Sequence, residues 1–280
     1  MFVVVVLGIG WLVDEMYSGG GFYLTIAIVY SLVTALFSYY KGDKVALAVS
    51  GAKEVTREEN PYVVRMVENL CIASGMPQPR VHIINDSAIN AFATGRDPEH
   101  ASIAVTTGAI EKLENEELEG VIAHELSHIQ NYDIRVMTIV IVLVGVITIL
   151  GDMVFRITLF GGRGRNRDGG GGMLLLVGFA LMIFAPIVAQ LIKLAVSRKR
   201  EFLADASSAL MTRFPEGLAR ALQKIEADGK PMTRKSAATA HLFIANPFSG
   251  KAFAGLFSTH PPIEKRVQAL RTMGNVHQET

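Results

Sequence analysis

The chain has 280 residues, of which 50% are apolar and 19% are charged, and its formal net charge is +1. Disorder is excluded, because disordered chains are polar and highly charged. A nucleic-acid partner is not expected, since a net charge of +1 gives no long-range attraction to phosphates. The single cysteine, Cys71, excludes an intrachain disulfide framework and a cysteine-rich zinc finger. The apolar excess must therefore form a large core or cross a membrane.

Four apolar runs hold most of this excess. They cover residues 1–13, 22–40, 136–155 and 173–196. About 20 apolar residues cross a bilayer core as a helix, so the last three runs predict transmembrane helices. The alternative is a buried helix of a soluble core, which rarely sustains such a run. The first run is too short for a full crossing, and we interpret it as a short first span.

Basic residues predict the orientation of these spans. Lys41 and Lys44 follow the second run, and the basic stretch 198–200 follows the fourth, which favours the cytoplasm for both polar parts of the chain. The link between the third and fourth runs argues against this, because it is also rich in arginine. The prediction is a multi-pass protein of the cell (plasma or inner) membrane.

The runs also divide the chain into parts. We expect a transmembrane hairpin at 1–40, a second hairpin at 136–196 with an external Gly/Arg-rich loop at 156–172, and two polar parts at 41–135 and 197–280. The polar parts together are long enough for one compact domain. Periodicity predicts helices near 61–74, 215–226 and 262–271, and strands at 80–84 and 102–106. The predicted fold class is α+β and mostly helical.

The segment 118–131 contains an HExxH motif formed by His124, Glu125 and His128. Asn115 is the expected N-cap of a helix here, with acidic residues in its first turn. On a helix the two histidines share one face, so both imidazoles can bind one zinc ion at about 2.0–2.1 Å. Glu125 projects beside the metal, where a carboxylate can act as a base. A chance HExxH occurs in roughly one such chain in a hundred.

A catalytic zinc ion usually has three protein ligands, so a third is expected. Glu201 and Asp205 lie four residues apart on one predicted helix face. Glu201 could bind zinc, while Asp205 accepts the second ring N–H of a ligand histidine, with His124 as the expected partner. The alternative is a solvated acidic face. The competing third ligands are His241 and His260.

Further motifs extend over nearly the whole chain. They are NAFATG at 90–95, IAVTTG at 103–108, HELSH at 124–128, EFLAD at 201–205 and THPP at 259–262. With these motifs the chain resembles the HtpX membrane metalloproteases, which are related to the CAAX prenyl endopeptidases. The short first apolar run is the main departure from the family pattern.

The resemblance implies about four transmembrane helices and a zincin-like catalytic domain split by a transmembrane hairpin. It implies one zinc ion per subunit, held by His124, His128 and Glu201, with Glu125 as catalytic base. It also implies that His260 approaches the metal, where it would steady an oxyanion or occupy the open position. Capping of the following helix is the alternative for His260.

The substrate cleft is expected beside Asn90 and the strand 102–106, through Ile103 and Val105. An edge strand there could pair with an extended peptide, although core packing explains it equally well. The helices that carry the ligands are expected to run unbroken into the spans, which would hold zinc on the order of 10 Å from the membrane boundary.

The predicted function is a membrane-embedded zinc metalloendopeptidase. It would cut cytoplasmic segments of membrane proteins, including misfolded or damaged ones, in stress response and quality control. Its partners would be the lipid bilayer and protein or peptide substrates, and a homo-oligomer is open. One alternative is a non-catalytic scaffold or chaperone with a structural zinc, which would need no base at Glu125. Another is a small transporter that uses Asp152, Gln190 and Lys193.

Overall fold

The computed structural model describes residues 6–8, 10–11, 14–15, 19–142, 198–234, 236, 239–248 and 261–276. The helices in this part are α2 (Phe22–Ser50), α3 (Pro61–Ser74), α4 (Thr107–Lys112), α5 (Asn115–Gln130), α8 (Arg198–Thr212), α9 (Pro215–Asp228) and α11 (Ile263–Val276), with 3-10 turns η1 (Pro98–His100) and η3 (Ala240–Leu242). Residues 133–142 are also helical. The strands are β1 (Lys53–Glu54), β2 (Arg80–Ile84), β3 (Ala91–Gly95) and β4 (Ala101–Thr106). The α+β, mostly helical class is confirmed.

The strands form one sheet in the order β1-β2-β4-β3. β4 runs parallel to β2 and antiparallel to β3, so Ile103 pairs with Val81 on one side and with Ala93 on the other. The expectation that 102–106 is an edge strand is therefore wrong, because both of its sides are hydrogen-bonded. The edge on this side is β3, which the sequence did not reveal.

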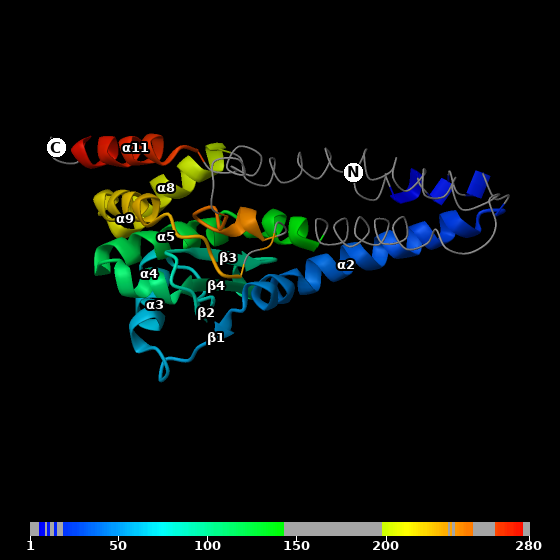
Figure 1. Ribbon diagram of the computed structural model, residues 1–280, viewed down its shortest axis with the longest axis horizontal. Coiled ribbons are helices and arrows are strands. Elements are labelled where there is room, and N and C mark those ends of the chain that lie inside the picture. Colours follow the sequence, from blue (N-terminus) through cyan, green and yellow to red (C-terminus); the bar gives the residue numbers. More distant parts are fainter. Residues whose placement is uncertain are drawn as a thin grey trace.

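Both faces of the sheet are covered. The side chains of Ile103, Val105 and Ala91 point into a core shared with α3, α5 and α9. Their neighbours Phe92 and Ala104 point the other way, toward the end of α2 and the helix 133–142. The two groups point to opposite faces because successive side chains along a strand alternate between the faces of the sheet. Figure 1 shows α5 between the sheet and the pair α8 and α9, with α11 outermost.

The core draws on residues from both sides of the undescribed stretch 143–197. α5 packs against both α8 and α9. Gly120 of α5 permits this, because a Cβ there would lie 2.7 Å from the backbone nitrogen of Leu218. Ser208 of α8 then donates a hydrogen bond to the Gly120 carbonyl (3.0 Å). The two halves of the polar sequence thus share one core.

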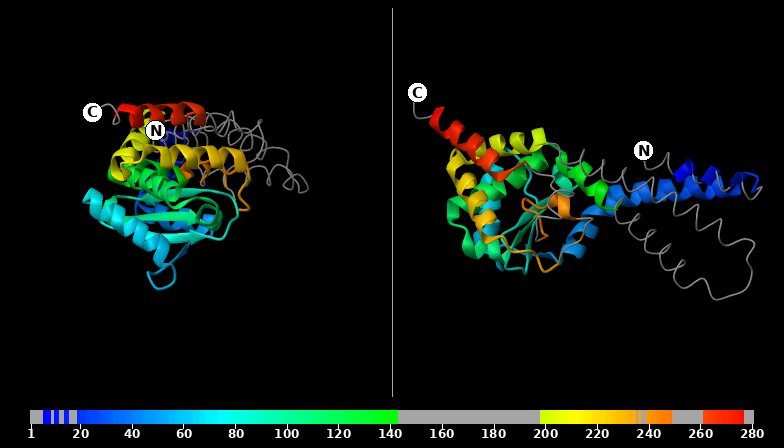
Figure 2. Two further views of the ribbon diagram at one scale, coloured as in Figure 1. Left: turned by 90° about the vertical axis from the view of Figure 1, so that its left-hand side faces the viewer. Right: turned by 45° about the horizontal axis from the view of Figure 1, so that its top comes forward.

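The helix α2 projects away from this domain (Figures 1 and 2). It is 29 residues long, so the apolar run 22–40 continues as helix to Ser50. Among the described residues, α2 is the one helix that is long and apolar enough to cross a membrane. From Phe22 to Ala46 its buried positions are small or weakly polar: Ala27, Ser31, Thr34, Ser38, Gly42 and Ala46. Its exposed positions include Phe22, Ile26, Val29, Leu32, Val33, Leu36 and Phe37.

This arrangement is the reverse of an amphipathic helix in a soluble protein, which buries its large apolar side chains. Small residues instead mark close helix packing inside a bilayer. The small residues Ser38 and Gly42 of α2 lie against the helix 133–142. There the Ser38 hydroxyl donates to the Ile139 carbonyl (3.1 Å). The third and fourth runs lie outside the described residues, except for 136–142.

The helix α5 does not continue straight into 133–142. It ends at Gln130, and Tyr132 adopts a left-handed φ of 59°. The expectation of an unbroken helix from His128 toward the third run is therefore wrong, because a left-handed residue ends the regular i→i−4 hydrogen bonding.

Candidate metal centre

The helix α5 begins with a capping box rather than with the expected cap. Glu114 is the N-cap, and its backbone N–H donates to the carboxylate of Glu117 (2.8 Å). Asn115 is the first helical residue, so its prediction as N-cap is wrong; its side chain accepts a hydrogen bond from the Tyr62 hydroxyl (3.2 Å). The motif His124–His128 follows two turns later, in the buried centre of the domain.

The structure brings His124, His128 and Glu201 together. One ligand atom from each lies within 4.8 Å of the others. The Nε2 atoms of the two histidines are 3.2 Å apart, and Glu201 oxygens lie 3.7 Å from His124 Nε2 and 3.6 Å from His128 Nε2. Two ligands of a tetrahedral zinc ion are separated by about 3.3 Å when each bond is about 2.0–2.1 Å. The three side chains fit such an ion.

A carboxylate lies behind His124. Asp205 Oδ1 is 3.0 Å from His124 Nδ1, which is the contact expected from the sequence. Arg266 of α11 fixes this carboxylate, because its Nε and one NH2 group donate to the two Asp205 oxygens at 2.9 and 2.7 Å. Arg266 is fully buried. Sequence reasoning missed it, since a charged residue in the amphipathic helix 263–276 resembles a solvated one.

A second carboxylate lies behind His128. Asp133 Oδ2 is 3.0 Å from His128 Nδ1, and Asp133 also pairs with Arg200. Sequence reasoning missed this residue as well. The Nδ1 atoms of both histidines thus have a carboxylate partner, and both Nε2 atoms face Glu201.

The charges of this centre favour a divalent cation. The buried acidic side chains around the two histidines are Glu125, Asp133, Glu201 and Asp205. The arginines beside them are Arg200 and Arg266. With both imidazoles neutral, these described residues leave two negative charges in excess. An unbalanced buried charge is strongly unfavourable, so a doubly charged ion fits the site.

The two histidines differ in their titration. Burial lowers the pKa of His124 to about 4, helped by the Arg266 charge and opposed by Asp205. Burial also acts to lower the pKa of His128, but the hydrogen bond with Asp133 and the carboxylates Glu201 and Glu125 outweigh it and raise that pKa to about 9. At neutral pH, His124 is therefore ready to bind a metal, whereas His128 must first release a proton.

Glu125 lies on α5 beside both ligands and is only 2% exposed. Its charge is close enough to raise the pKa values of His128 and Arg266. The side chain of Glu125 is therefore in the electrostatic field of the centre, as the motif predicts.

The competing ligand His241 is not part of this group. Its Nε2 lies 3.0 Å from the Met137 carbonyl. Cys71 is buried, and burial raises the pKa of its thiol to about 11, in agreement with a packing role. The remaining candidates lie outside the described residues: His260, Asp152, Gln190 and Lys193.

The predicted cleft residues lie in different surroundings. Ile103 and Val105 are completely buried and fill the core on the α5 side of the sheet. Their assignment to a cleft is wrong, because a central strand directs these side chains into the interior. Asn90 joins β3 to the segment after η3: its Nδ2 donates to the Ala245 carbonyl (3.0 Å) and its Oδ1 accepts from the Ala245 N–H (3.2 Å).

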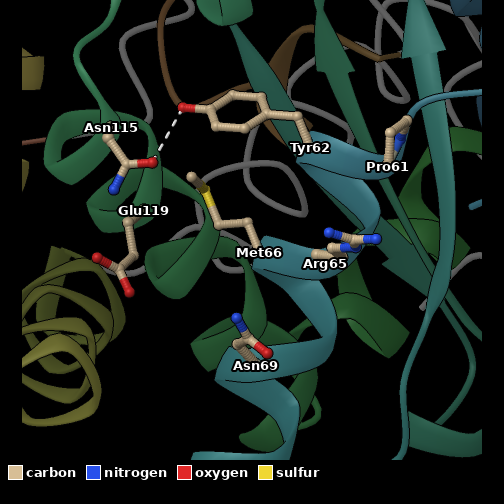
Figure 3. Close-up of a pocket in the computed structure, with 7 residues that line it drawn as sticks. All are labelled: Pro61, Tyr62, Arg65, Met66, Asn69, Asn115 and Glu119. Atoms are coloured by element: carbon tan, nitrogen blue, oxygen red, sulfur yellow. Dashed lines mark hydrogen bonds between the residues drawn. The ribbon is translucent and has the colours of Figure 1, made fainter.

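A surface pocket of about 450 Å³ opens between α3 and the first turn of α5 (Figure 3). It is lined by Pro61, Tyr62, Arg65, Met66, Asn69, Asn115 and Glu119. Figure 3 shows the Tyr62 hydroxyl directed toward the Asn115 side chain, with their hydrogen bond as a dashed line. The candidate metal ligands His124, His128 and Glu201 are not among its lining residues.

The sequence matches known proteins over most of its length. Residues 57–274 match the family described as peptidase family M48. The chain belongs to peptidase family M48. It is 48% identical to a "Protease HtpX homolog" of Dictyoglomus turgidum, over 90% of this chain and 82% of that protein. A protein of the same name from Tropheryma whipplei is 45% identical, over 98% of this chain and 93% of that protein. One from Pyrococcus furiosus is 46% identical, over 95% of this chain and 90% of that protein. The predicted HtpX-type resemblance is confirmed.

A solved structure gives an independent likeness of fold. It is the crystal structure of S. mikatae Ste24p, with a TM-score of 0.55 and 17% identity, and the match covers 94% of this chain. This chain spans only 62% of that protein's length, and the likeness concerns the fold alone. M48 membership and the His/His/Glu centre together make the chain a metalloprotease.

The histidine pKa values predict how metal binding depends on pH. His128 loses one proton when a metal binds, whereas His124 is already neutral at pH 7. The apparent Kd for zinc should therefore fall by about tenfold per pH unit from pH 7 to 9 and then level off. Competition with a chelator of known affinity at several pH values measures this slope. A Kd that is constant from pH 7 to 9 would contradict it.

Proposed function

We propose that this chain is a zinc-dependent, membrane-embedded endopeptidase. The observation that carries the proposal is the group His124, His128 and Glu201, whose ligand atoms lie within 4.8 Å of one another beside the buried Glu125. A His/His/Glu set with one open position is the ligand set of catalytic zinc in peptidases. One zinc ion per subunit is proposed.

The chemistry divides between the metal and the chain. When bound, zinc would supply a Lewis acid that polarises a peptide carbonyl and lowers the pKa of water. Glu125 would accept the proton of the attacking water and pass it to the leaving amine. Asp205 would hold His124 through Nδ1, and Arg266 would keep Asp205 ionised and in place. His260 is proposed to stabilise the developing oxyanion.

The pattern of α2 supports insertion into a membrane. Its large apolar side chains face outward and its small residues face the neighbouring helix. In water, such exposed apolar surface would be unfavourable, whereas lipid tails solvate it. We propose that the undescribed runs add further spans, for about four in all, so that the hairpin 136–196 divides the catalytic domain into the parts 41–135 and 197–280.

The end of the apolar stretch indicates where the bilayer would meet the domain. Tyr39 and Tyr40 directly precede Lys41, as in the aromatic and basic belts at membrane surfaces. Arg96, in the β3–β4 connection, lies with its guanidinium 5.5 Å from the Tyr40 ring centre. This contact supports placing that connection, and so the edge strand β3, at headgroup level.

The substrates proposed are cytoplasmic segments of membrane proteins, including misfolded or damaged ones, in the cell (plasma or inner) membrane. A site close to the bilayer would reach chain segments that soluble proteases reach less easily. Assembly into a homo-oligomer is compatible with this proposal, and no nucleic-acid partner is proposed.

A non-catalytic scaffold with a structural metal is the second candidate. It shares the ligand set but needs no carboxylate beside the metal. Structural zinc sites are usually closed by four protein ligands, and three ligands gather among the described residues. The transporter alternative rests on residues outside the described part.

Substitution of Glu125 separates the enzyme from the scaffold. Glu125→Gln in the detergent-purified chain should retain zinc, because Glu125 is not a ligand, and should lower casein cleavage by about 100-fold or more, because the base is lost. Glu116→Gln, in the exposed first turn of the same helix, is the matched control and should cleave normally. Cleavage at the parental rate by zinc-loaded Glu125→Gln would refute the mechanism.

Labelling tests the proposed orientation. Arg57 lies on an exposed part of the polar domain, so Arg57→Cys in a Cys71→Ser background should react with a membrane-impermeant maleimide only after the cells are permeabilised. Reaction in intact cells would place the domain outside and reverse the proposed topology.

A further inference from the structure

The turn that ends α5 places one acidic residue against a metal ligand. Asn131 caps the helix, and the left-handed Tyr132 reverses the chain before the helix 133–142 begins. In an unbroken helix, residue 133 would lie about 140° around the axis from residue 128, and would point away from it. Tyrosine is unfavourable in this conformation, since its Cβ is crowded there. The chain thus adopts a strained turn at the point where it brings Asp133 back to His128.

Both oxygens of the Asp133 carboxylate are used. Oδ2 lies 3.0 Å from His128 Nδ1, and Oδ1 accepts a hydrogen bond from the guanidinium of Arg200. Asp133 is only 2% exposed, whereas 44% of the Arg200 side chain is exposed. The arrangement therefore has a buried carboxylate that faces the imidazole and an arginine that approaches from the surface.

Arg200 links this contact to the third ligand. It immediately precedes Glu201 on α8. The ion pair between Asp133 and Arg200 thus joins the chain just after His128 to the chain just before Glu201. It also joins the described parts of the chain on either side of the undescribed stretch 143–197.

The other ligand histidine has a similar support. Asp205 faces His124 Nδ1 at 3.0 Å and is held by Arg266. The two histidines are therefore each backed by an aspartate, and each aspartate by an arginine. This repetition in unrelated sequence positions argues that Asp133 acts on the metal centre, rather than merely closing a turn.

We propose that Asp133 is a positioning residue for His128, and that Arg200 holds Asp133 in place; the inference rests on the proposed zinc site. The carboxylate accepts the Nδ1 hydrogen of His128. This fixes the tautomer that leaves the Nε2 lone pair for the metal, and it increases the electron density that the imidazole donates. Zinc affinity therefore depends on a residue that never touches the ion.

Zinc affinity of the full chain, measured by chelator competition in detergent, tests this role. Asp133→Ala should bind zinc about 10- to 100-fold more weakly. The isosteric Asp133→Asn, which keeps an acceptor oxygen, should lose less. Arg200→Ala should weaken binding less than Asp133→Ala. The double variant should be no weaker than Asp133→Ala, because the two residues act as one unit.

Two matched controls come from the same chain. Asp97 forms a similar aspartate–histidine contact with His100 (2.7 Å) on the surface, so Asp97→Ala should leave zinc affinity unchanged. Lys199→Ala removes the basic neighbour of Arg200 and should also have no effect. His124→Ala tests the site itself, since loss of a ligand should abolish tight binding.

Two further readouts distinguish positioning from a structural role. In the cobalt-substituted protein, Asp133→Asn should shift the d–d absorption bands, because the His128 ring is less constrained. Asp133→Asn should lower the melting temperature more in the zinc-loaded protein than in the metal-free protein, because it also weakens zinc binding. The inference would be overturned if the zinc Kd of Asp133→Ala stayed within twofold of the parent value. It would also be overturned if Asp133→Asn lost the same melting temperature with and without zinc. If His124→Ala also kept full affinity, the proposed zinc site itself would be wrong.

Discussion

The balance of charge inside the domain is the constraint around which the rest is arranged. Four acidic side chains and two imidazoles meet where water is excluded, and such a cluster is stable only if positive charge compensates it. Arg266 and Arg200 supply part of that charge from α11 and α8. The remainder matches a divalent ion at the three converging ligand atoms. Folding and metal binding are coupled in such a centre.

The packing of the helices follows from this need. α5 must carry both histidines in the interior, so it is covered by the sheet on one side and by α8 and α9 on the other (Figure 1). Gly120 allows α9 to approach, and Ser208 fixes α8 against α5. Glu201 is thereby held opposite the histidines, although 72 residues separate it from His128 along the chain.

A short chain of contacts links this centre to the proposed membrane boundary. Asp133 contacts His128, and two residues later the Arg135 Nε donates to the Arg96 carbonyl (2.7 Å). Arg96 in turn lies against Tyr40 of α2. The same part of the domain therefore supports the candidate ligand His128 and faces the end of the apolar run in α2, as the proposed protease at a membrane surface requires.

The sequence predicted those features that depend on local spacing. HExxH placed two histidines on one helix face, and the interval from Glu201 to Asp205 placed a candidate ligand and its supporting carboxylate on another. Asp133 could not be predicted, because its contact depends on a left-handed tyrosine that no residue preference suggests. Arg266 was missed because burial of an arginine depends on partners distant in sequence.

The sheet shows the same limit. The strand 102–106 was found from its alternation, but its central position depends on non-local pairing, which the sequence did not reveal. β3 was missed altogether, since Ala91, Ala93 and Gly95 are small residues with little preference for strands and only Phe92 and Thr94 favour one.

Anomalous diffraction from crystals of the zinc-loaded chain, recorded above and below the zinc absorption edge, would locate the ion. One zinc peak is expected at about 2 Å from His124 Nε2, His128 Nε2 and a Glu201 oxygen. A chain loaded with zinc that shows no peak at this position, or shows its only peak elsewhere, would contradict it.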